Sequence, residues 1–381
     1  MVTPETLAAL ETALDGALSR SLQSAVTELL AQNPANIIPS MVNPYATAGT
    51  TYDPTFAATG FPQWGAAGTA TNKYSGFVPA PDGKLYGVPF NASSVIEFDP
   101  VNKASINWGS VGTGTSKWVG GVLGPDGKIY CIPLNASQVL VIDPVNKTTA
   151  FIGSLGTSSN KWMGGVLHPN GKIYGIPHTS RNVLEIDPAA GTAITNTSVN
   201  VNANTKWAGG VLCPDGDIAF IPYSRTAVRK WNPTTGVSQE TTVPSMIAGA
   251  WMGGCLLPNG KIYGAPYNES TILEYDPVTR VVRKFGNFGT ATAKCVGVVM
   301  APNGNGYTIP FTGGQIIEIN GYLATAAAHP ISASTTQWMG GALGVDGKIY
   351  GCPRNSQRVL EIGIGARGPN WWGLSAYMNK F

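Results

Sequence analysis

Charged side chains are scarce in this 381-residue chain. Asp, Glu, Lys and Arg together make up 12% of it, about half of the roughly 25% typical of soluble domains. The formal net charge is +3, and Lys and Arg never form a run. Nucleic-acid binding depends on clustered cations, so the sequence predicts no nucleic-acid partner. No apolar stretch reaches the roughly 18 residues of a membrane span, so it also predicts no membrane insertion.

Residues that carry chemistry are few as well. The three histidines, His168, His178 and His329, occupy unrelated positions and form no metal-binding spacing such as H-x-x-x-H. The five cysteines are odd in number and contain no C-x-x-C pair, which favours buried free thiols. G-x-S-x-G, phosphate-loop and calcium-loop motifs do not occur. We therefore predict no catalytic residue, no metal site and no cofactor.

Repetition, by contrast, is abundant. The stretch "KWVGGVLGPDGKIYCIP" begins at Lys117, and "KWMGGVLHPNGKIYGIP" begins at Lys161. Seven copies align on one anchor residue, at spacings of 44, 44, 45, 44, 44 and 43 residues: Tyr74, Trp118, Trp162, Trp207, Trp251, Cys295 and Trp338. Each copy carries Asp-Gly or Asn-Gly after its anchor. A period of about 40–50 residues is typical of propellers and solenoids.

Each copy predicts four short antiparallel strands. Asp-Gly and Asn-Gly favour a hairpin with a type I′ turn, in which both central residues have φ > 0. A proline such as Pro133 ends the second strand, and an Asp-Pro pair such as Asp143-Pro144 marks the turn after the third. Four-stranded units at this period are propeller blades. The fold class is therefore all-β, a seven-bladed β-propeller with about 44 residues per blade.

Two recurring features of the first strand suit the crowded centre of such a ring. Paired glycines, as in Gly120-Gly121, permit close backbone approach, and the anchor tryptophan packs between blades. The third strand carries a recurring glutamate, which we expect at an exposed position: Glu97, Glu185, Glu274, Glu318 and Glu361. A lysine that follows the turn in five copies is expected on a solvated rim.

The ring must also be closed, because an unpaired blade edge invites aggregation. The seventh copy lacks a fourth-strand pattern, whereas the segment before the first copy resembles one. We therefore expect residues 55–64 to complete the blade that begins at Trp338. The propeller then spans residues 55–365, followed by a C-terminal tail at 366–381.

The N-terminal segment differs in pattern. Residues 1–32 predict an amphipathic helix that begins near Pro4 and ends before Asn33-Pro34. Its apolar residues recur at a helical spacing and form one stripe: Leu7, Leu10, Leu14, Leu18, Leu22, Val26 and Leu29. Residues 33–54 are rich in Pro, Ala and Thr and predict an extended arm. The stripe is expected to drive homo-oligomerisation or docking on a partner; packing on its own propeller is the alternative.

The loops after the second and fourth strands are expected to share one face of the propeller. They are neutral and rich in hydroxyls and amides, with single aromatic residues among them. Such surfaces suit a glycan or a protein, and ordinary solvated loops are the alternative. The candidate contact residues are Phe90, Asn91, Asn135, His178, Tyr223, Tyr267, Phe311 and Arg354.

The pattern "WMGGVLHPNGKIYGIPHTSRNVLEIDP" resembles a propeller repeat of phage and other virus-associated proteins, which also occurs in some cellular proteins. The ending "LSAYMNKF" is similar to short tails that close some phage virion proteins. The resemblance implies a phage particle as the location, at the tail or capsid surface, and carries over no catalytic residue.

We therefore expect a non-enzymatic virion protein whose helix binds other virion proteins and whose propeller serves as fibre, decoration or host-contact module. Its loops would contact a host-surface glycan or protein. Two alternatives stay open: a propeller enzyme of lactonase or lyase type with a central metal, and a cellular scaffold for protein interactions.

Overall fold

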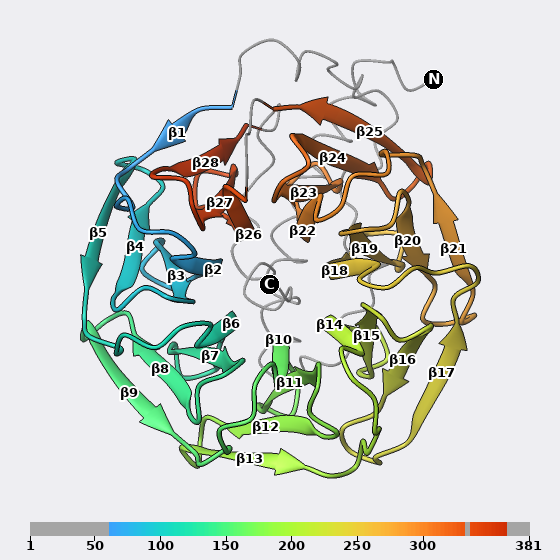
Figure 1. The fold of residues 1–381 in the computed structure, drawn as a ribbon, viewed down its shortest axis with the longest axis horizontal. Coiled ribbons are helices and arrows are strands. Elements are labelled where there is room, and N and C mark those ends of the chain that lie inside the picture. The colour runs from blue at the N-terminus through green and yellow to red at the C-terminus, as the bar shows by residue number, and fades with distance from the viewer. Residues whose placement is uncertain (1–60, 332–335, 364–381) are drawn as a thin grey trace, which may run out of the picture. The chain divides into compact units, whose positions relative to one another are not determined.

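The computed structural model describes residues 61–331 and 336–363. Within these residues, 28 strands form seven four-stranded antiparallel sheets, and the fold is a seven-bladed β-propeller. Figure 1 shows the blades in chain order around the axis. The predicted helix with its stripe from Leu7 to Leu29, the arm at 33–54 and the tail at 366–381 lie outside the described residues.

Every blade repeats one strand order from the axis outward. The first strands, nearest the axis, are β2 (Tyr74–Pro79), β6 (Trp118–Leu123), β10 (Trp162–Leu167), β14 (Trp207–Leu212), β18 (Trp251–Leu256), β22 (Cys295–Met300) and β26 (Trp338–Leu343). The second strands are β3 (Leu85–Pro89), β7 (Ile129–Pro133), β11 (Ile173–Pro177), β15 (Ile218–Pro222), β19 (Ile262–Pro266), β23 (Gly306–Pro310) and β27 (Ile349–Pro353).

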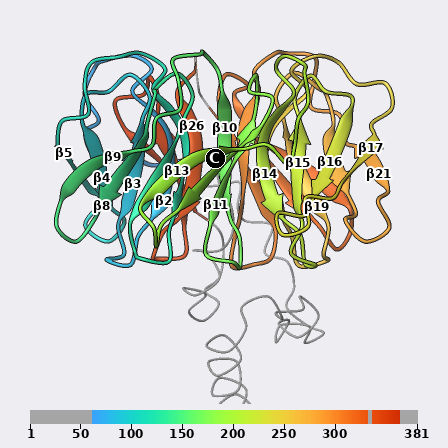
Figure 2. The same ribbon diagram turned by 90° about the horizontal axis from the view of Figure 1, so that it is seen from below.

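The third strands are β4 (Val95–Asp99), β8 (Val139–Asp143), β12 (Val183–Asp187), β16 (Ala227–Trp231), β20 (Ile272–Tyr275), β24 (Gln315–Asn320) and β28 (Val359–Ile362). The outer strands are β5 (Ala104–Trp108), β9 (Thr148–Ile152), β13 (Thr192–Asn196), β17 (Ser238–Thr242), β21 (Val282–Phe285), β25 (Thr325–Pro330) and β1 (Gln63–Trp64). Blades are numbered 1 to 7 from β2, and the side view shows their sheets standing next to one another around the ring (Figure 2).

The hairpin between the first two strands of a blade is not the predicted type I′ turn. Of the Asp82-Gly83 pair in blade 1, Gly83 has a positive φ of 80°, whereas Asp82 does not. The Gly83 N–H donates to the Ala80 carbonyl and the Ala80 N–H to the Lys84 carbonyl, at 3.0 Å each. This is a type I turn followed by a glycine bulge. Proline in the first central position favours it, because its φ of about −65° suits a type I turn.

The paired glycines of the first strand have two different roles. The first glycine has a positive φ in every blade, for example 75° at Gly120, and there the pairing with the second strand shifts register. The second glycine allows close packing on the preceding blade. A Cβ at Gly210 would lie 2.5 Å from Cδ1 of Ile176, so that side chain would have to move to admit it.

Blades 1 and 6 lack the second glycine, and the preceding blade compensates. Val298 stands at this position in blade 6, and the isoleucine that would oppose it is replaced by Ala265 in the same apolar cluster. Phe77 stands there in blade 1, where Cys352 of blade 7 provides the smaller partner. Across the blade interface, a larger side chain on one blade therefore faces a smaller residue on the other. The total volume stays nearly constant, as close packing requires.

The predicted role of the anchor tryptophans is confirmed. Trp207 and Trp251 are fully buried, and the anchor tryptophans of the other blades are at most 2% exposed. Each indole Nε1–H donates to the carbonyl oxygen of the residue 20 positions later, as from Trp162 to Asn182 at 2.8 Å. The ring is thus apolar filling between sheets, and its only polar group is satisfied.

The recurring glutamates of the third strand are not exposed, contrary to the prediction. Glu97, Glu274, Glu318 and Glu361 are 2–5% exposed. Glu274 binds Lys261 at 3.0 Å, and this lysine is one of those expected on a solvated rim. Burial of a carboxylate is tolerated because a cross-strand cation and further hydrogen bonds satisfy it. Blade 4 reverses the pair, with Asp217 opposite Lys230 at 3.5 Å.

Blade 7 obtains its outer strand from the N-terminal side of the chain. β1 pairs with β28 in antiparallel register, Gln63 opposite Leu360 and Trp64 opposite Val359. Trp64 Nε1 also donates to Glu361 Oε2 at 2.7 Å. The described part of the segment expected to close the ring, from residue 61, therefore lies on the last blade.

Substitution of Gly210 tests the size exchange between blades. Gly210→Val is expected to lower the free energy of unfolding by roughly 1–3 kcal/mol, because the new side chain collides with Ile176. The double variant Gly210→Val with Ile176→Ala should lose less free energy of unfolding than the two single variants together. Urea unfolding should show a difference of about 1 kcal/mol or more. Gly209→Val is the control, since its φ of 92° is strained whatever Ile176 becomes. Additive losses at Gly210 would contradict the exchange.

Deletion of residues 55–64 tests the closure. It removes β1 and leaves β28 with an unpaired edge. We expect a marked fall in melting temperature, measured by differential scanning calorimetry. An unchanged melting temperature would show that the ring does not depend on this strand.

Candidate functional site

A closed belt of backbone hydrogen bonds surrounds the axis on the face that carries the loops after the second and fourth strands, here called the loop face. Lys117 N–H donates to the Phe90 carbonyl of blade 1, and the Lys117 carbonyl accepts from Leu134 N–H of its own blade, both at 2.9 Å. The same two bonds recur in all seven blades, with N···O distances of 2.7–3.1 Å, and the last returns from Lys73 to Arg354.

The belt residues that follow the second strands point their side chains at one another. They are Phe90, Leu134, His178, Tyr223, Tyr267, Phe311 and Arg354, one from each blade. Aromatic centroids lie 5.2 Å apart for His178–Tyr223 and 5.9 Å apart for Tyr223–Tyr267 and Tyr267–Phe311. The structure thus brings six of the eight predicted contact residues into one ring, the axial ring. Leu134 was not predicted, because an aliphatic side chain carries no aromatic or polar signal of a contact residue.

The axial ring is packed rather than open. Its members Phe90, Leu134 and Phe311 belong to one apolar cluster with residues that follow the anchors, among them Val119 and Met252. Phe90 and Phe311 are only 9% and 8% exposed. The gap between ribbons at the centre of Figure 1 is therefore filled with side chains at this level.

Arg354 is the cation of the axial ring. Its guanidinium lies 4.3 Å from the ring centroid of Phe90 and 5.4 Å from that of Phe311, at cation–π distance from both. Nε donates to Asn72 Oδ1 at 2.9 Å, and within the described residues no carboxylate pairs with it. Burial lowers the pKa of Arg354 to about 10, so the group stays charged at neutral pH.

The three histidines lie in three different places. His178 is buried in the axial ring, its Nδ1 bonds the Trp207 carbonyl at 2.9 Å, and burial lowers its pKa. His168 bonds the Gly216 carbonyl at the opposite end of the strands. His329 lies on the outer strand β25, where it pairs with Glu318 at 2.9 Å. In residues 61–331 and 336–363 no three His, Cys, Asp or Glu side chains are placed to hold a metal ion.

The remaining predicted contact residues, Asn91 and Asn135, tie blades together. Asn91 Oδ1 accepts from Ser116 N–H at 2.7 Å, and Asn135 Oδ1 accepts from Asn160 N–H at 2.8 Å. Both donors belong to the next blade and have positive φ, 50° and 56°. Each asparagine thus holds a strained backbone turn, and only its Nδ2 remains for another contact.

Buried lysines of the belt were not predicted. Lys73, Lys117, Lys161, Lys206 and Lys294 precede the anchors and are 0–6% exposed. Lys206 Nζ donates to three backbone carbonyls, of His178, Ser180 and Ala203, at 2.7–3.1 Å. Burial lowers the pKa of Lys117, Lys161 and Lys206 to about 8. The sequence does carry a signal for them, because a lysine directly precedes the anchor in five copies. A recurring lysine by itself does not indicate burial.

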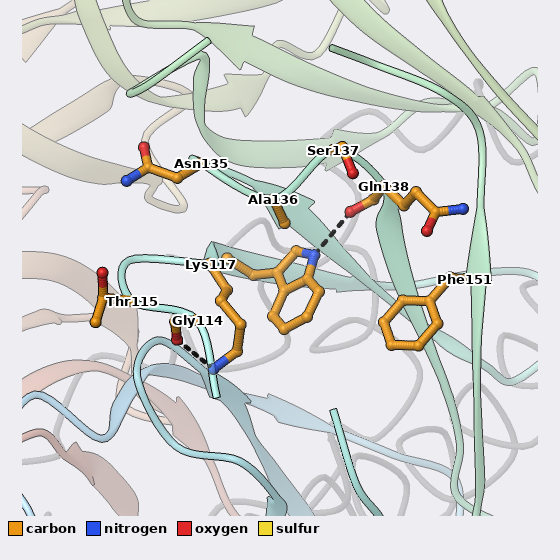
Figure 3. Close-up of a pocket in the computed structure, with 9 residues that line it drawn as sticks. Gly114, Thr115, Lys117, Asn135, Ala136, Ser137, Gln138 and Phe151 are labelled. Atoms are coloured by element: carbon orange, nitrogen blue, oxygen red, sulfur yellow. Dashed lines mark hydrogen bonds between the residues drawn. The ribbon is translucent and has the colours of Figure 1, made fainter. Parts of the chain in front are cut away.

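A cavity of about 280 Å³ opens on the loop face of blade 2. It is bounded by the lead-in to β6, the loop after β7 and the outer strand β9; its lining residues are Gly114, Thr115, Lys117, Trp118, Asn135, Ala136, Ser137, Gln138 and Phe151. Figure 3 shows Phe151 beside the indole that bonds the Gln138 carbonyl. We refer to this cavity as the blade 2 pocket.

Comparison with known proteins identifies the fold alone. No protein-family model and no curated protein matches the sequence. A streptogramin B lyase structure is 15% identical with a TM-score of 0.68, covering 79% of this chain and 96% of that one. Virginiamycin B lyase from Staphylococcus aureus is 13% identical with a TM-score of 0.68, covering 79% and 98%. A hydrazine synthase structure from Kuenenia stuttgartiensis is 14% identical with a TM-score of 0.59.

The described residues contain no helix of the length and apolar character that crossing a bilayer demands.

The buried belt lysines predict a specific pH dependence. Because the pKa of Lys206 is about 8 in the folded chain and about 10.5 when unfolded, the unfolded state binds more protons between these values. The native protein should therefore gain stability relative to Lys206→Met as the pH rises from about 8 to 10.5, by roughly 1–3 kcal/mol. Urea unfolding of both proteins across this range measures the difference.

Lys172→Met is the matched control. Its hydrogen bond to Glu185 raises the pKa of Lys172 above the ordinary value, so its contribution is lost only at still higher pH and its difference from native should stay flat across the window. A flat difference for Lys206→Met as well would contradict the assignment.

Proposed function

We propose that this chain is a non-enzymatic structural and recognition protein of a bacteriophage particle. Its propeller is displayed at the tail or capsid surface as fibre, decoration or host-contact module. The N-terminal segment attaches it to other virion proteins and to further copies of itself. The loop face contacts a host-surface glycan or protein.

One observation carries the non-enzymatic part of this proposal. General acid–base catalysis needs a titratable group that can exchange a proton with the substrate near the working pH. On the axial ring the titratable side chains are His178, Arg354 and two tyrosines whose pKa burial raises, Tyr223 and Tyr267. The buried glutamates of the third strands are occupied by cross-strand partners, as Glu361 is by Lys348. Because His178 is held by the Trp207 carbonyl and burial raises the pKa of both tyrosines, the axial ring is suited to filling space and binding rather than to proton transfer.

The phage location rests on the resemblance of the repeat and the C-terminal tail, together with the amphipathic N-terminal pattern and the low charge. The propeller supports this role physically: loops from all seven blades lie together on the loop face, and loops held by a rigid scaffold are a common place for contacts.

Density-gradient sedimentation of the native source lysate, followed by mass spectrometry of the fractions, tests this role. The full chain is expected with large particles, and a chain lacking residues 1–47 is expected in the soluble fractions. The sharper comparison is Leu14→Asp with Leu18→Asp, on the apolar stripe, against Thr12→Asp with Gln23→Asp, off it. Only the stripe variant should lose particle association.

Recovery of the full chain solely in soluble fractions would overturn the phage role and favour a cellular scaffold. Equal behaviour of the two aspartate variants would overturn attachment through the stripe.

A lyase is the second candidate, because lyases are prominent among the structures that share the fold. One of them is a catalytically inactive histidine-to-alanine variant of virginiamycin B lyase with bound quinupristin. His178 is the histidine of the loop face in the described part of this chain. Incubation with quinupristin, followed by liquid chromatography, tests this candidate. Consumption by the native protein and none by His178→Ala would favour the lyase, as would calcium or magnesium found by elemental analysis.

A further inference from the structure

We propose that the blade 2 pocket binds a neutral sugar ring, stacked on Phe151 and hydrogen-bonded by the loop amides and hydroxyls around it. The inference rests on the proposed contact role of the loop face, and it names the site and the ligand class. It is argued from the aromatic surface, the polar groups, the charge and the size of the pocket.

The aromatic surface is provided by Phe151. Its side chain is 45% exposed, although it is a large apolar group. It stacks on Trp118 at 6.1 Å between centroids and 21° between planes. Trp118 is itself 2% exposed, and its Nε1 is held by the Gln138 carbonyl at 2.9 Å. Phe151 thus presents a ring that is already fixed in place, which lowers the entropy lost on binding.

The repeats provide an internal comparison for this position. Phe151 lies opposite Leu140, the third-strand residue just before the position of the recurring glutamate. The outer-strand residues at the equivalent place in the other blades are Asn107, Thr195, Thr241, Lys284, Ala328 and Gln63. Five of these six side chains are polar and the sixth is a methyl group, so blade 2 is the one blade with a large apolar ring at this exposed place. Together with the pocket beside it, this ring offers a ligand an aromatic surface that the other blades lack.

The polar groups around Phe151 are neutral. Thr115, Ser137 and Gln138 use no side-chain atom in a hydrogen bond within the described residues, and Asn135 retains its Nδ2. Hydroxyls and amides both donate and accept, which matches the hydroxyls of a sugar. The C–H groups on one face of a pyranose carry partial positive charge and suit the negative face of Phe151.

The charge and the size of the pocket further limit which ligands can fit. Lys117 is the one charged residue among those lining the pocket, and its Nζ donates to the Ala92 and Gly114 carbonyls at 2.9 Å each. No cation is left to pair with an acidic sugar and no carboxylate to pair with a base. A volume of about 280 Å³ is at the small end for ligand sites, so it fits one ring of a glycan.

Saturation-transfer NMR with the full chain tests the proposal. The probes are the methyl glycosides of glucose, galactose, mannose and N-acetylglucosamine, with methyl glucuronide as the anionic comparison. At least one neutral glycoside is expected to bind, and the glucuronide is expected to bind more weakly. Phe151→Thr, which introduces the residue of blade 3, should weaken binding about tenfold or more. Gln138→Ala should weaken it to a smaller degree.

Tyr322→Thr is the matched control, because Tyr322 is 53% exposed and lies in the turn after β24, away from the pocket. It should leave binding unchanged, and thermal melting of each variant confirms that it folds. Failure of all neutral glycosides to bind would overturn the proposal, as would unchanged binding by Phe151→Thr or preference for the glucuronide. Particle association in the sedimentation experiment is measured separately, so failure of the pocket and failure of the virion role are distinguishable.

Discussion

The backbone belt around the axis ties each blade to both of its neighbours at the same radius. Its hydrogen bonds join the residue before each anchor to the residue after the second strand of the preceding blade, as from Lys206 to His178. In a chain whose repeats touch only their neighbours, such nearest-neighbour contacts supply the stability that no single blade has. The buried lysines add ammonium hydrogen bonds to backbone carbonyls at and beside the belt. Everything on the loop face is built on this frame.

Because the frame repeats, single positions can change only together with the positions that face them. Val298 is tolerated where glycine is usual because Ala265 faces it, and Phe77 because Cys352 does. The ion pair across the second and third strands can be reversed in blade 4, with Asp217 and Lys230, since the opposite charges still meet. Phe151 differs from its counterparts at an exposed place on the outer strand, where it stacks on Trp118 and still remains 45% exposed. This exposure beside the pocket is the physical reason to connect it with binding.

The same packing decides where binding can occur. At the level of the belt the axis is occupied by the axial ring and the apolar cluster beneath it. Arg354 is held there between two phenyl rings, where it completes the ring of contacts. The blade 2 pocket lies between the lead-in to β6, the loop after β7 and the outer strand β9. Trp118 and the strand pairing of β9 fix its walls, whereas its loop residues can vary in sequence at little cost to the fold.

Several properties could be predicted from the sequence alone. The spacing of the anchors, the turn glycines and the prolines that end the second strands determined seven four-stranded blades, since these signals are local and each blade folds by local pairing. The clustering of residues after the second strand was also foreseen in part, because equivalent positions of a ring converge on its axis. Tertiary structure alone decided the rest. Whether Glu97 is exposed depends on Lys147 of the next blade, and whether Lys117 is buried depends on carbonyls 25 residues away. The repeat pattern specifies one blade, whereas burial, charge pairing and the blade 2 pocket arise between segments that only the closed ring brings together.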